Sequence, residues 1–205
     1  MHDLLPLFSS PVYSTSLDLS SQPDLATVDM MPFSYAEISQ DNHILDQPAW
    51  QPIRQQILQH LQQLFYQELD SHPEVDIQIT LSWVNRYTQG QYQPRHYHAA
   101  AAFTGVLFLT DHAQGLDLWS ARRPLITWQQ RPNILNTASW RIPAERGRLI
   151  IMPADLDHST DPVVSGTRWT LAFDAAVVGQ LFFNEVRDYT IRDALKSIGS
   201  SPGIH

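Results

Sequence analysis

A change in hydrophobic period near residue 75 constrains the fold more than any other feature of the chain. Between residues 49 and 69, apolar side chains recur every three or four positions and glutamines fill the other face, which predicts an amphipathic helix. From residue 75 to residue 87, apolar and polar residues alternate, which is typical of a strand with one buried face. The sequence therefore predicts one helix followed by a region of strands.

Short apolar segments bounded by turns continue through this region. Residues 4–20 contain interrupted strand material, residues 20–48 predict a loop with short pieces of structure, and residues 188–198 predict a short helix. Many short strands with a supporting helix favour a mainly β fold of the jelly-roll type. Further strands are predicted at residues 103–109, 116–119, 148–153 and 168–173.

The length of the chain predicts a single domain that spans residues 1–205. We expect its core at residues 75–174. An N-terminal strand, a loop and the supporting helix would occupy residues 1–70, and a C-terminal helix and tail would occupy residues 180–205.

Composition argues against several classes of protein. A net charge of -8 and the lack of any basic run argue against a nucleic-acid partner. The chain has no cysteine, which excludes disulfides and thiolate metal sites. No segment approaches the roughly 20 apolar residues of a membrane span, and Asp3 lies where a signal peptide would be basic. We expect a cytoplasmic protein without membrane contact; its oligomeric state, a homodimer included, stays open.

Three histidines have a spacing that suits a metal site. In a strand, His96 and His98 would point to the same face, and His158 could supply a third imidazole from another strand. Imidazole binds iron, zinc, nickel or copper, so the residues alone leave the metal open. A surface or hydrogen-bonding role for the His-x-His pair is the alternative reading.

Three segments around these histidines share a spacing with a known family. Residues 87–91 read Tyr-Thr-Gln-Gly-Gln and begin nine positions before His96, and residues 104–109 read Thr-Gly-Val-Leu-Phe-Leu. Residues 158–169 read His-Ser-Thr-Asp-Pro-Val-Val-Ser-Gly-Thr-Arg-Trp. Together they resemble the iron(II)- and 2-oxoglutarate-dependent dioxygenases, particularly the prolyl-4-hydroxylase-like branch, over residues 83–174.

Two further segments narrow this resemblance. Residues 7–13 and the Trp83-x-Asn85 pair are similar to a little-characterised bacterial and phage subgroup in which the metal motif is often His-x-His. The resemblance implies a double-stranded β-helix, a cupin-like jelly roll. It also implies Fe(II), 2-oxoglutarate and O2 as cofactor and cosubstrates, with hydroxylation of a small-molecule or peptide substrate and release of succinate and CO2.

The closing strand agrees with this implication. Arg168, Thr170 and Ala172 share one face of a strand, so a guanidinium would lie in the interior, where it needs an anion. The resemblance implies that the anion is the distal carboxylate of 2-oxoglutarate, bound by Arg168 with help from Thr170 and Tyr87. A structural salt bridge to an Asp or Glu is the alternative.

Position 98 departs from the family, whose iron centre usually has two histidines and one carboxylate. We expect His96, His98 and His158 to be the metal ligands. Alternatively, His98 supports a site in which Asp155, Asp157 or Asp161 supplies the third bond, or the site is degenerate. Two other functions stay open: a cupin-like three-histidine metalloenzyme that does not use 2-oxoglutarate, and a non-catalytic jelly-roll binding module.

Overall fold

Two antiparallel β-sheets and one principal helix make up the computed structural model, which describes residues 9–121, 131, 133 and 136–178. The larger sheet has the strand order β1-β8-β5-β10-β4-β3-β2, and the smaller has the order β7-β6-β9. The strands are β1 (Tyr13–Ser16), β2 (Met30–Phe33), β3 (Ala36–Ser39), β4 (Asp76–Tyr87), β5 (Phe103–Phe108), β6 (His112–Trp119), β7 (Ser139–Ala144), β8 (Arg148–Pro153), β9 (His158–Ser159) and β10 (Arg168–Val178).

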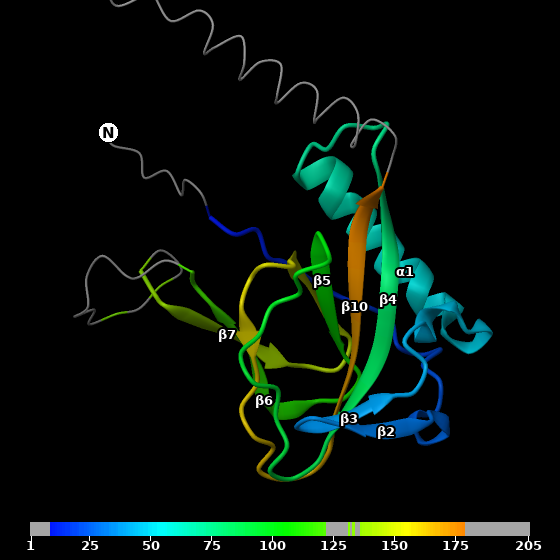
Figure 1. Ribbon diagram of the computed structural model, residues 1–205, viewed down its shortest axis with the longest axis vertical. Coiled ribbons are helices and arrows are strands. Elements are labelled where there is room, and N and C mark those ends of the chain that lie inside the picture. The colour runs from blue at the N-terminus through cyan, green and yellow to red at the C-terminus, as the bar shows by residue number, and fades with distance from the viewer. Residues whose placement is uncertain (1–8, 122–130, 132, 134–135, 179–205) are drawn as a thin grey trace, which may run out of the picture.

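The larger sheet separates the helix from the smaller sheet. In Figure 1 the long strands β4 and β10 run side by side, with α1 (Gln51–Gln62) on one side of them and β6 and β7 on the other. One core cluster joins α1 to the sheet, and a second joins β5 and β8 to β6 and β7. The mainly β fold class with a supporting helix is confirmed.

The predicted helix at residues 49–69 is confirmed, with a change of winding along its length. A 3-10 turn at Pro48–Trp50 leads into α1, and a π-helical segment (Gln63–Glu68) follows it. Ile53, Ile57 and Leu61 are fully buried and pack against the face of β10 that carries Leu171 and Phe173. Each such aliphatic side chain contributes about 1.5–3 kcal/mol by leaving water.

A β-bulge divides strand β4 into two parts that face opposite ways. Leu81 pairs with Asp174, but Ile79 pairs with the very next residue of β10, so Thr80 has no partner across the ladder. Ile77 therefore faces the helix, whereas Trp83, of the same parity, faces away from it. The even alternation over residues 75–87 predicts a single buried face, and that prediction is wrong.

A close approach between β5 and β10 explains a glycine in the middle of a buried strand. Gly105 pairs with Phe173, and a Cβ atom added at Gly105 would lie 2.2 Å from the Phe173 ring. The ring thus occupies the space that any side chain at position 105 would need.

Other sequence predictions differ from the structure in detail. Residues 20–48 contain a β-hairpin, β2–β3, which extends the larger sheet beyond β4, and β7 was not predicted at all. Strand material at residues 4–20 reduces to β1 within the described residues. The helix predicted at residues 188–198 lies outside the described residues. Within the described part of the chain, no helix is both long and apolar enough to cross a membrane.

Candidate metal centre

The space between the two sheets contains a cavity of about 350 Å³. Its walls come from β2, β3, β4, β5, β6, β9 and β10, and from the loop that carries His96 and His98. Arg168, Thr170 and Ala172 alternate with residues of the helix-side core, as predicted for β10, and Thr170 and Ala172 line the cavity. The site therefore lies on the sheet face opposite α1.

The structure brings the three predicted histidines together. One ligand nitrogen from each of His96, His98 and His158 lies within 4.8 Å of the others. Residues 96–98 are not in a regular strand, contrary to expectation. Only His96 forms a β-bridge, and its partner is His158.

Main-chain hydrogen bonds hold these segments in place. The N–H of His96 donates to the carbonyl of His158 at 3.0 Å, and the N–H of His158 donates back at 2.9 Å. The N–H of His98 donates to the carbonyl of Ala154 at 2.8 Å. The loop that precedes β5 thus runs beside the segment that enters β9, and this brings the three imidazoles together.

Each of the three rings has Nδ1 within 3.0 Å of an oxygen atom. His96 Nδ1 lies 2.9 Å from the carbonyl of Pro94, and His158 Nδ1 lies 3.0 Å from the carbonyl of Leu156. His98 Nδ1 lies 2.7 Å from Oδ1 of Asp174. A proton on each Nδ1 leaves the Nε2 lone pair free, and this arrangement is the one that metal-binding histidines adopt.

The electrostatics of the cluster favour neutral imidazole. Burial, and then the neighbouring His96, lowers the pKa of His158 to about 4, and burial also lowers the pKa of His96. Neutral imidazole is the form that binds a metal. Three imidazole nitrogens within 4.8 Å of one another fit a divalent transition metal such as Fe(II).

The carboxylates considered as substitutes for His98 are committed elsewhere or exposed. Asp157 is ion-paired with Arg95 at 2.6 Å, and Asp161 is ion-paired with Arg141 at 2.5 Å. Asp155 is exposed on the turn after β8. Within the described residues, the cluster that could hold a metal contains histidines alone.

Arg168 is a buried cation without an anionic partner. Its side chain is 0% exposed, and Nη2 donates to the hydroxyl of Thr160 at 2.7 Å. Its Nε has no hydrogen-bond partner, and no carboxylate among the described residues is ion-paired with it. The alternative of a structural salt bridge is therefore wrong for the part of the chain that the structure describes. A bound carboxylate would supply the anionic hydrogen-bond partner that this guanidinium needs.

Tyr87 contacts Arg168, and Thr170 lies two positions after Arg168 on β10. The guanidinium carbon of Arg168 lies 4.4 Å from the centre of the Tyr87 ring, which is a cation–π contact. Burial raises the pKa of Tyr87 to about 12. Asn85 lies beside Thr170, with Nδ2 3.4 Å from Oγ1, and both line the cavity.

Two residues of this site were missed in the sequence. Thr160 lines the cavity and binds Arg168, and it follows His158 by two positions. Asp174 contacts His98, and it is the next residue after Arg168, Thr170 and Ala172 on the same face of β10. Extending that alternation by one step would have identified it.

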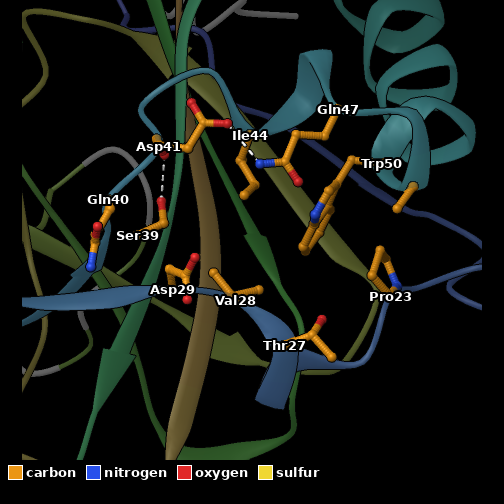
Figure 2. A pocket seen from close by; sticks show the side chains of 11 residues that line it. Pro23, Thr27, Val28, Asp29, Ser39, Gln40, Asp41, Ile44, Gln47 and Trp50 are labelled. Carbon is orange, nitrogen blue, oxygen red and sulfur yellow. Dashed lines mark hydrogen bonds between the residues drawn. The ribbon is translucent and has the colours of Figure 1, made fainter.

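A second cavity, of about 230 Å³, lies away from the histidines, between residues 23–29 and 39–50. Figure 2 shows two hydrogen bonds in its lining: Gln47 Nε2 donates to the Asp41 carboxylate at 2.7 Å, and the Ser39 hydroxyl donates to the Asp41 carbonyl at 2.7 Å. The described residues that line this cavity contain no candidate metal ligand set.

Comparison with known proteins points to one family. Residues 81–174 match the family model described as "Putative 2OG-Fe(II) oxygenase", and this range contains every candidate site residue named above. The resemblance to iron- and 2-oxoglutarate-dependent oxygenases is thereby confirmed. No curated protein matches the chain significantly.

Solved structures show the same fold at low sequence identity. The HygX structure from Streptomyces hygroscopicus with nickel, 2-oxoglutarate and hygromycin B bound has a TM-score of 0.58 and 9% identity, over 82% of this chain and 83% of that one. An oxidoreductase of the 2OG-Fe(II) oxygenase family from Burkholderia pseudomallei has a TM-score of 0.52 and 15% identity, over 74% and 73%. The α-ketoglutarate-dependent epimerase SnoN from nogalamycin biosynthesis has a TM-score of 0.54 and 10% identity, over 74% and 67%. The two sheets are therefore those of a double-stranded β-helix.

Proposed function

We propose that this chain is a dioxygenase that uses Fe(II), 2-oxoglutarate and O2 to hydroxylate a small molecule or peptide with release of succinate and CO2, because residues 81–174 match the 2OG-Fe(II) oxygenase model. The observation that carries this proposal is Arg168. A fully buried guanidinium with an unbonded Nε lies beside a three-histidine cluster, and a dicarboxylate cosubstrate supplies the anion that it needs.

His96, His98 and His158 are the proposed iron ligands, each through Nε2. His158 is fixed by its backbone pairing with His96 and by the contact of Nδ1 with Leu156. Such outer contacts set the tautomer and the direction of the ring, so the ligands are oriented before the metal arrives. This arrangement favours the three-histidine reading over one in which an aspartate completes the site.

Arg168 is proposed to bind the distal carboxylate of 2-oxoglutarate. The hydroxyls of Thr160 and Thr170 flank the same end of the cavity, and the ring of Tyr87 supports the guanidinium. A guanidinium presents its donors in a planar fork that matches a carboxylate. Its charge, held in a buried site, selects a doubly anionic cosubstrate over a neutral one.

The oxidising chemistry is supplied by iron and 2-oxoglutarate when they are bound. The chain provides placement and exclusion of water. Val106, Phe108 and Leu116 form an apolar wall of the cavity, and Phe108 is completely buried. No side chain in the cavity is assigned as a general base, because the Nε2 lone pairs of the three histidines are assigned to the metal and Nδ1 of His96 and of His158 faces a backbone carbonyl.

We place the substrate side of the cavity where its lining residues are most exposed, on β2 and the neighbouring parts of β3 and β4. Phe33, Ile38, Leu81 and Trp83 line it there, and Phe33 is 55% exposed. An apolar, aromatic rim suits a small molecule or a peptide side chain that presents a C–H bond. Two of the similar structures point the same way, since HygX was crystallised with hygromycin B and SnoN comes from nogalamycin biosynthesis.

The test is O2-dependent succinate release from 2-oxoglutarate by the Fe(II)-loaded protein. We expect turnover that Arg168→Ala and His158→Ala abolish and that His72→Ala, a change at an exposed histidine outside the cluster, leaves intact. Failure of the anaerobic Fe(II) protein to bind 2-oxoglutarate would overturn the proposal. Stoichiometric iron without any effect of 2-oxoglutarate would instead favour the cupin-like metalloenzyme.

A further inference from the structure

Asp174 lies beside the three-histidine cluster, and the proposed function gives it no role. It lies on β10, on the same face as Arg168, Thr170 and Ala172, and its partner on β4 is Leu81, directly beside the bulge at Thr80. The Thr80 hydroxyl donates to the carbonyl of Asp174 at 3.2 Å. Bulges near functional sites commonly redirect a side chain, and this one holds the Asp174 backbone at the end of the cavity nearest His98.

The carboxylate of Asp174 faces His98. Its Oδ1 lies 2.7 Å from Nδ1 of His98, and the two side chains are only 13% and 12% exposed. The pair is not aligned as a hydrogen bond, and Oδ1 has no other hydrogen-bond partner among the described residues. A buried carboxylate oxygen without a donor is costly, and a small rotation of the His98 ring would bring the Nδ1 proton into line with it.

Ring stacking restricts the orientation of the His98 ring plane. Its ring is nearly parallel to Trp83, with centroids 5.9 Å apart and planes 16° apart, and to His158, with centroids 5.2 Å apart and planes 20° apart. The plane of the His98 ring is therefore set by two neighbours. Rotation within that plane, which decides where Nε2 points, is left to the contact with Asp174.

Charge gives Asp174 a second role. The usual centre of this class has two histidines and one carboxylate, so the ligands remove one positive charge from Fe(II). Three neutral imidazole ligands carry no negative charge, so they leave the positive charge of Fe(II) undiminished. A carboxylate on the far side of His98 restores the missing negative charge one ring away from the metal, and it makes the imidazole a stronger donor.

We propose that Asp174 is the positioning residue of the metal centre: its carboxylate orients His98 toward the metal and replaces the charge of the carboxylate ligand that the three-histidine set lacks. The inference rests on the proposed metal site but not on the binding of 2-oxoglutarate. It makes the functional centre a set of three histidines and one aspartate, in which the aspartate acts through His98.

Metal affinity tests the charge. Asp174→Leu removes the acceptor and the charge at similar volume, and Asp174→Asn removes the charge alone. Asp117→Asn is the matched control, because Asp117 is equally buried, at 11% side-chain exposure, and is paired with Arg141 rather than with a histidine. We expect Fe(II) affinity, measured anaerobically against a chelator, to fall about 10–100-fold in Asp174→Leu, less in Asp174→Asn, and less than about twofold in Asp117→Asn.

A spectroscopic measurement tests the orientation independently of activity. In the Zn(II)-loaded wild-type protein, imidazole ¹H–¹⁵N spectra should show His98 with a protonated, strongly hydrogen-bonded Nδ1. In Asp174→Leu this signal should shift or exchange with water, while the signals of His96 and His158 persist. An unchanged His98 signal would overturn the positioning role.

The outcomes separate this inference from the proposed function. Wild-type affinity in Asp174→Asn and Asp174→Leu, with normal 2-oxoglutarate turnover, overturns the role of Asp174 and leaves the oxygenase intact. Absence of metal binding in the wild-type protein overturns both. If Asp174→Leu fails to fold, as judged by its melting without metal, Asp174→Asn carries the comparison, since its side chain is nearly isosteric.

Discussion

His96 and His158 exchange both of their backbone hydrogen bonds, at 3.0 and 2.9 Å, although they lie 62 residues apart in the chain (96 to 158). In an antiparallel ladder such a reciprocal pair fixes the separation of the two Cα atoms. The main chain, rather than the metal, therefore brings these two ligands together. The pairing does not involve the imidazole rings, so loss of one ring should leave the fold intact.

Replacing His96 by alanine should separate folding from metal binding. We expect His96→Ala to melt cooperatively without metal, because the backbone bridge does not need the ring, but to lose the stabilisation that Mn(II) gives the wild-type protein. That stabilisation is about 2.7 kcal/mol at a free metal concentration 100 times the dissociation constant. Thermal melts with and without Mn(II) measure it, and His72→Ala should behave as wild type. Equal Mn(II) shifts in His96→Ala and the wild type would contradict the three-histidine site.

Replacing Arg168 by methionine should abolish 2-oxoglutarate binding without lowering the stability of the fold. The guanidinium is buried without an anion, so a side chain of similar size and no charge should leave the free energy of unfolding equal or raise it by about 1 kcal/mol. The same change should abolish 2-oxoglutarate binding, measured by calorimetry on the anaerobic Mn(II) protein. Arg54→Met, on the far side of the sheet, should keep that binding. A strongly destabilised Arg168→Met would show that an anionic partner is already present without ligand.

Two substitutions at Tyr87 should distinguish its ring from its hydroxyl. The ring lies under the Arg168 guanidinium, whereas the hydroxyl makes only a long contact of 3.4 Å with Gln93. Tyr87→Phe should therefore change 2-oxoglutarate affinity less than about twofold, and Tyr87→Leu should weaken it by about 3- to 10-fold through the lost cation–π contact. Calorimetric titration compares them. An equal loss in both variants would assign the effect to the hydroxyl.

A methyl group at position 105 should strain the sheet between β5 and β10. Its Cβ would lie 2.2 Å from the buried ring of Phe173, so Gly105→Ala should lower the free energy of unfolding by about 1–3 kcal/mol. Urea denaturation measures this cost. The double variant Gly105→Ala with Phe173→Leu should recover part of it relative to the sum of the single changes, because the smaller side chain leaves room. If the free-energy changes of the two single variants add strictly, the strain in Gly105→Ala does not come from the Phe173 ring.

The parts of the site that the sequence predicted are those that depend on spacing along one element. Arg168 and Thr170 follow from alternation in a strand, and the helix follows from its period. The convergence of His158 with His96 depends on the pairing of loops far apart in the chain. No local pattern encodes that pairing, and only the family resemblance indicated it.

The missed features depend on long-range pairing or on an interrupted ladder. The hairpin β2–β3 has short strands with a proline in β2, and its role depends on pairing with β4. Asp174 looked like an ordinary polar residue at the end of a strand. Its partner His98 lies in a segment without regular structure, so no periodicity relates the two.

The bulge at Thr80 changes which side of the sheet the residues of one parity in β4 face. On one side of it, Ile77 and Ile79 belong to the core under α1; on the other, Trp83, Asn85 and Tyr87 belong to the cavity, although all five have the same parity in the sequence. Without the bulge, residues of one parity would all face the same side of the sheet, and Trp83, Asn85 and Tyr87 would lie on the core side with Ile77 and Ile79. The unpaired Thr80 thus moves the second group of same-parity residues from the core side of the strand to the cavity side.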